Sequence, residues 1–66
     1  MIRNDTELHA NQERILLFER LLAEARKTYS ASNYQTMAEG YLIQIDQMQA
    51  EIRAYLSRLP DPSEAA

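Results

Sequence analysis

The sequence predicts an all-α protein, an antiparallel two-helix hairpin that dimerises into a four-helix bundle. The first observation is composition: good helix formers predominate, with one glycine and two prolines among 66 residues. The second is a heptad pattern over residues 34–59, which is typical of a helix packed lengthwise against other helices. One seam position holds Ala38, Ile45, Ile52 and Leu59, and the other holds Tyr34, Tyr41, Met48 and Tyr55.

The first helix is expected at about residues 5–28. Asn4, with Glu7 three residues later, or Asp5 alone, can accept hydrogen bonds from the unpaired backbone donors at a helix start. The apolar residues of this segment cover roughly half of the helix circumference, which is more than one neighbouring helix requires. They are Leu8, Ile15, Phe18, Leu21, Leu22, Ala25 and Tyr29, with Leu17 at the edge of the arc.

The second helix is expected at about residues 33–59. Ser32 and Gln35 fit a capping box, and the short polar break before them makes the two helices antiparallel neighbours. Gly40 lies inside this helix and away from the seam, which favours a tolerated surface glycine over a close contact with another chain. Residues 1–59 thus form the hairpin. Residues 60–66 are expected to be a disordered tail because Pro60 and Pro62 remove backbone donors.

Self-association follows from size and pattern. Sixty-six residues are marginal for a single core, and an apolar arc this wide needs more than one covering helix. A two-fold dimer lets the same surface cover itself. The residues expected to carry it are Ile15, Phe18, Leu22, Tyr41, Ile45, Met48, Ile52 and Tyr55.

The candidate chemistry is sparse, so we expect neither an enzyme nor a bound cofactor. Asp5, His9 and Glu13 are spaced four apart and share one helix face, but the Glu-x-x-His pair of bundle metal sites is absent, which favours a solvated face over a metal site. The sequence lacks cysteine, and its serines cluster at the inter-helix break, where capping explains them.

Charge and hydropathy limit the other classes. The net charge of −3 with interspersed signs disfavours a nucleic-acid surface, and two helices lack a helix-turn-helix scaffold. The longest large apolar run covers residues 15–18, far short of a membrane span, and no secretory leader is visible. We therefore expect a cytoplasmic protein that binds neither nucleic acid nor membrane. Leu16 and Ile43 fit neither apolar stripe and are the residues expected to bind a protein partner.

The opening of the chain resembles a known family. The run Met1–Leu8, followed by Arg14-Ile15 and Leu21-Leu22-Ala23, is similar to the opening helix of antitoxins of the HigA type. The second helix, with Tyr55 near its end, and the run Pro60–Ala65 look like that family's approach to its DNA-binding part. In the family a helix-turn-helix domain follows, whereas this chain stops. The resemblance therefore implies the helical hairpin without the DNA reader, and a toxin as a partner.

Two interpretations remain open from the sequence. The first is a protein-interaction module, a self-associating hairpin that docks a partner within a toxin–antitoxin or related regulatory system. The second is a purely structural oligomer, or an adaptor unrelated to toxins. Nothing in the sequence separates them.

Overall fold

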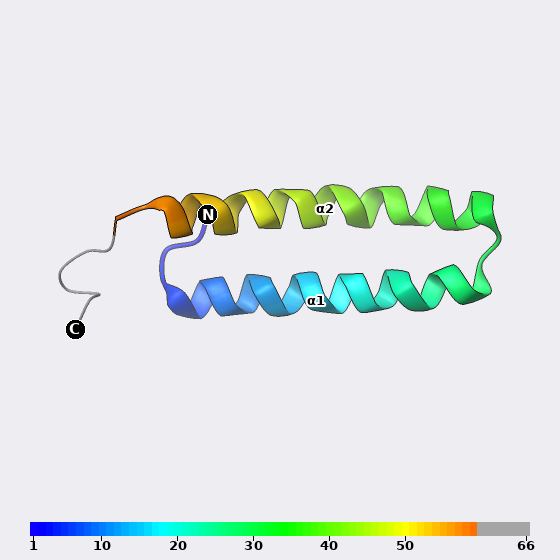
Figure 1. Cartoon of the computed structure of the whole chain (residues 1–66), viewed down its shortest axis with the longest axis horizontal. Coiled ribbons are helices and arrows are strands. Elements are labelled where there is room, and N and C mark those ends of the chain that lie inside the picture. The colour runs from blue at the N-terminus through cyan, green and yellow to red at the C-terminus, as the bar shows by residue number, and fades with distance from the viewer. Residues whose placement is uncertain (60–66) are drawn as a thin grey trace.

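The chain folds into the predicted all-α hairpin. The computed structural model describes residues 1–59, in which two helices, α1 (Asp5–Thr28) and α2 (Ala31–Ser57), lie side by side and antiparallel (Figure 1). The connection between them is Tyr29 and Ser30, and no strand is present in this described part. The all-helical, two-helix architecture expected from composition and heptad spacing is confirmed.

Both ends of α1 agree with the sequence prediction. Asn4 is the N-cap, with an extended backbone, and its side chain accepts a hydrogen bond from the Glu7 backbone N–H at 2.9 Å. The Glu7 carboxylate in turn accepts from the Arg3 backbone N–H at 2.8 Å. This reciprocal pairing satisfies two donors near the helix start. At the other end the Tyr29 backbone N–H donates to the Ala25 carbonyl at 2.9 Å, and α1 stops there.

The bounds of α2 differ from those expected. The N-cap is Ser30, whose hydroxyl accepts from the Asn33 backbone N–H at 3.3 Å, so the predicted capping box at Ser32 and Gln35 is wrong. Ser32 lies inside the first turn, where its carbonyl accepts from the Thr36 hydroxyl at 3.1 Å. Ser30 and Ser32 both lie where a serine could cap this helix start, and Ser30 is the one that does so.

The end of α2 also comes earlier than the heptad pattern suggests. The helix stops at Ser57, and the Arg58 backbone N–H donates to the Tyr55 carbonyl at 3.2 Å. Leu59, expected in the seam, lies beyond the helix and is 89% exposed. The residue before a proline is biased towards extended backbone, so the pattern could not be continued to Leu59. The tail predicted at residues 60–66 lies outside the described residues.

The core is one row of side chains between the two helices. It contains the predicted seam residues Ala38 and Ile45, which are 2% and 6% exposed, against Ile15 and Leu22 of α1. Every buried residue within 1–59 is apolar. These are Ile2, Leu8, Ile15, Leu22, Ala25, Ala38, Ile45 and Met48.

Candidate protein-interaction surfaces

The hairpin has two long faces, because each helix has one neighbour and is open on both sides of the contact. An approximate two-fold axis, normal to the plane of the two helices, relates one helix to the other. Side chains rotated from the buried seam by the same angle in the same sense therefore lie on the same face in both helices. At roughly 100° per residue, Leu16 and Glu19 lie to one side of the buried Ile15, and Phe18 and Leu21 lie to the other side. The ring contact between Phe18 and Tyr41 places their flanks of α1 and α2 on a common face.

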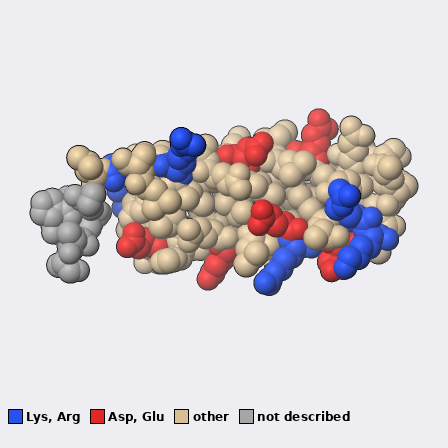
Figure 2. Space-filling view, viewed as in Figure 1, with Lys and Arg blue, Asp and Glu red and all other residues tan. Residues whose placement is uncertain are grey.

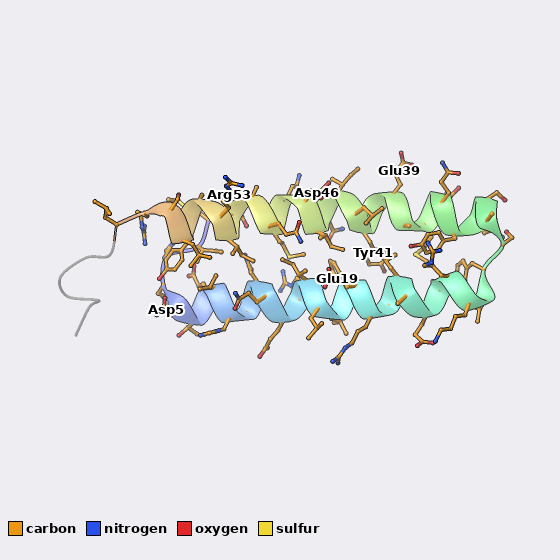
Figure 3. The ribbon with its side chains drawn as sticks, viewed as in Figure 1. Asp5, Glu19, Glu39, Tyr41, Asp46 and Arg53 are labelled. Atoms are coloured by element: carbon orange, nitrogen blue, oxygen red, sulfur yellow. The ribbon has the colours of Figure 1, made fainter. Side chains whose placement is uncertain are left out.

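We define the charged face as the one that carries Glu19 of α1 and Asp46 and Arg53 of α2. Figure 2 shows side chains of both signs on this face, and in Figure 3 Glu19 lies between the two ribbons on the viewer's side. Two exposed leucines also lie here, Leu16 on α1 and Leu42 on α2, which are 47% and 48% exposed. Charged residues stand three or four positions from each of them, Glu19 from Leu16 and Asp46 from Leu42, and single exposed aliphatic residues are common.

We define the apolar face as the opposite one, which carries Phe18 and Leu21 of α1 and Met37, Tyr41 and Met48 of α2. The Phe18 and Tyr41 rings meet edge to face, with centroids 5.1 Å apart and planes at 76°. This is a favourable aromatic geometry. Phe18, Met37 and Tyr41 are half-buried and pack on the core, whereas Leu21 is 42% exposed. The core is therefore displaced towards this face and is incompletely covered there.

The residues predicted to carry self-association lie mainly inside the hairpin. Four of them form its buried core, and the other four are half-buried at its margin. The core residues are Ile15, Leu22, Ile45 and Met48, and the marginal residues are Phe18, Tyr41, Ile52 and Tyr55. These residues thus pack α1 against α2. A contact between two copies of the chain stays a prediction, and the half-buried residues and their exposed neighbours are the ones available for it.

The two residues predicted to bind a partner are both exposed but do not share a surface. Leu16 projects from the flank of α1, roughly 100° around the helix from the buried Ile15. Ile43 is 55% exposed and lies roughly 160° around α2 from the buried Ile45, on the side away from α1. A flat partner surface therefore reaches one of them at a time, and their role in binding stays a prediction.

The open end of the hairpin, opposite the turn, contains contacts that sequence reasoning missed. Ile2, expected in a short lead-in, is buried and only 4% exposed. The Met1 amino group pairs with Glu51 at 3.1 Å, and the Tyr55 hydroxyl donates to the Asp5 carboxylate at 2.6 Å. An apolar residue two positions before the N-cap was the available signal. Its burial depends on where α2 ends, which the sequence alone did not locate.

The candidate metal-ligating residues do not come together in the part of the chain that the structure describes. Within residues 1–59 no group of three or more His, Cys, Asp or Glu is placed to hold a metal ion. Of the predicted trio Asp5, His9 and Glu13, the structure engages Asp5 with Tyr55 on α2. Over the same residues, neither helix combines the length and apolar character that crossing a membrane requires.

A scan against models of protein families and searches of curated proteins and of solved structures found no match for this chain. The similarity to HigA-type antitoxins gains no support from these comparisons and stays a prediction.

Proposed function

We propose that this chain is a non-catalytic protein-interaction module, a cytoplasmic helical hairpin that dimerises into a four-helix bundle and docks a protein partner. The observation that carries the proposal is the uncovered apolar surface of α1. Leu17 and Leu21 are 62% and 42% exposed although they belong to the predicted apolar arc. Burying a leucine side chain is worth about 1.5 to 3 kcal/mol, so several exposed leucines per chain favour association.

A purely protein-binding role is supported by what the described surface offers. Its charges are exposed and of both signs, as Figure 2 illustrates, and they form no basic stripe for a phosphate backbone. Among its polar side chains, Asn4 and Ser30 cap the starts of the two helices, and the Tyr55 hydroxyl donates to Asp5 across the open end. On the resemblance to HigA-type antitoxins, we propose a toxin as the class of partner, without DNA binding, cofactor or membrane.

Self-association is tested by sedimentation equilibrium of the purified chain. We expect a folded dimer at tens of micromolar and a concentration-dependent shift towards monomer on dilution. A helical, cooperatively unfolding monomer at the same concentration would contradict the four-helix bundle.

Partner docking is tested by affinity purification from the native cells. The wild type is compared with a Leu16→Ser, Ile43→Ser double variant, which should stay folded because both side chains are exposed. We expect the variant to keep its self-association and to lose a specific partner. Recovery of no partner by the wild type would favour the purely structural oligomer. Equal recovery of one partner by both proteins would place docking elsewhere on the hairpin.

A further inference from the structure

We infer that the apolar face is the surface on which a second copy of this chain packs, and that the charged face stays exposed in the dimer. This inference rests on the proposed self-association and specifies its site. The two faces differ in charge, and the difference can be traced residue by residue along both helices.

The part of the apolar face nearest the turn carries no charge. From Phe18 to Ala25 of α1, the residues that project onto this face are uncharged, and so are those from Asn33 to Tyr41 of α2. Phenylalanine, tyrosine and methionine are enriched in the cores of protein interfaces, and charged residues are depleted there. The residues concerned are Phe18, Leu21 and Ala25, facing Asn33, Met37 and Tyr41.

Charge is present on the rest of the apolar face, from the middle of α1 to the open end. Arg14 and Glu7 of α1 and Glu51 of α2 project there. Interfaces commonly combine an uncharged core with a polar rim. The apolar face thus has the composition of both parts of an interface, in adjoining regions.

The two-fold symmetry of a dimer selects between the faces. In an isologous contact, residues near the axis meet their own copies, so a charge in the middle of the surface meets a like charge. The charged face has acidic Glu19 and Asp46 near its middle, and packing it on its copy would bring carboxylates together. On the apolar face, an axis through the Phe18–Tyr41 pair brings uncharged rings onto their copies and keeps Arg14, one helical turn away, off the axis.

The size of the face suits a second copy. With 24 residues, α1 is about 36 Å long, and two helices of about 10 Å diameter present roughly 700 Å² in projection. A standard interface removes about 800 Å² from each partner. One hairpin packed on another therefore covers the face.

The experiment compares two exposed leucines that differ in face. Leu21→Glu places a charge on the apolar face, and Leu42→Glu is the matched control on the charged face, where the wild-type side chain is equally exposed. We expect Leu21→Glu to raise the dimer Kd about 100-fold or more, because the charge enters the interface twice per dimer. Leu42→Glu should leave the Kd within about threefold of the wild-type value.

A second measurement distinguishes loss of dimerisation from loss of folding. The chain has no cysteine, so Leu21→Cys and Leu42→Cys each provide one thiol whose alkylation rate reports its exposure. Raising the protein concentration through the Kd should slow alkylation at position 21 and leave position 42 unchanged. Protection at position 42 alone, or at neither position in a proven dimer, would overturn the inference and leave the proposed self-association standing. A wild type that is monomeric throughout would overturn both.

Discussion

Replacing Gly40 by alanine tests how fully the structure accounts for the surface of α2. Gly40 lies in the middle of the helix, and a Cβ built on it meets nothing within 4 Å. The substitution therefore adds no contact and causes no clash in the hairpin. What changes is backbone conformational freedom, since glycine in a helix interior is about 0.8 to 1 kcal/mol less favourable than alanine. We expect Gly40→Ala to raise the free energy of unfolding by about this amount.

The effect is large enough to measure in so small a protein. For a domain of this size, 1 kcal/mol corresponds to a rise of about 4 to 8 °C in Tm. Far-ultraviolet circular dichroism should record it during thermal and urea unfolding at a fixed protein concentration. Because Gly40 projects to the outer edge of α2, sedimentation equilibrium should give the wild-type dimer Kd.

Ala50→Gly is the matched control, because Ala50 is also exposed in the interior of α2. It should lower stability by a similar amount, about 0.8 to 1 kcal/mol. The two positions are ten residues, or about 15 Å, apart along the helix, so the double variant should be close to the wild type. A Gly40→Ala protein that is less stable than the wild type, or that dimerises more weakly, would refute the open surrounding of Gly40 described above.

Two further substitutions test the contacts between α1 and α2. Ile45→Asp puts a charge into the core at a residue that is 6% exposed, and we expect it to abolish the cooperative helical transition, with a cost above about 3 kcal/mol. Ile45→Val at the same site should lower the free energy of unfolding by about 0.5 to 1.5 kcal/mol and leave the transition cooperative. If the two variants unfold in urea with the same midpoint, Ile45 is not in the core. Tyr55→Phe removes the hydroxyl that donates to Asp5 and should lower the free energy of unfolding by at most about 1.5 kcal/mol. Tyr29→Phe, at the exposed turn, should change it little, and a larger loss from Tyr29→Phe would argue against the contact at the open end.

The helices were predictable where local signals were unambiguous. Asn4 and Glu7 marked the start of α1, and the alternative cap, Asp5, differs from Asn4 by one residue only. The start of α2 was predicted wrongly at Ser32, because Ser30 and Ser32 are equally suited to capping. The choice between them depends on how tightly the chain turns from α1, which is a tertiary property. The end of α2 was predicted too late, because Leu59 continues the heptad spacing although the helix has already ended.

The surfaces were predictable in part. Helical periodicity correctly placed Leu16 and Ile43 outside the core, and it showed that α1 has more apolar surface than one neighbour covers. It did not anticipate that Ile2 is buried, because that contact joins residues far apart in sequence. The contrast between the two faces also emerges only when α1 and α2 are brought together, since neither helix alone shows which flanks share a face.

The two-residue turn also sets the order in which this hairpin closes. Residues of α1 and α2 that contact each other have numbers that add up to nearly the same value. The two aromatic rings, 18 and 41, give 59, and residues 5 and 55 at the open end give 60. Each doubling of the loop to be closed costs about 0.6 kcal/mol, so contacts form outward from the turn, each shortening the loop left for the next.

The contacts at Met1 and Asp5 span 50 residues. We expect them to form last and to open first, because they close the largest loop and lie at the end of the contact between the helices. We expect amide hydrogen exchange to show a gradient of protection along each helix, with rapid exchange near residues 5–8 and 52–57 and slow exchange around Leu22 and Ala38. The two helices are thus held together covalently at the turn, and hydrogen exchange in the turns at the open end reports their separation.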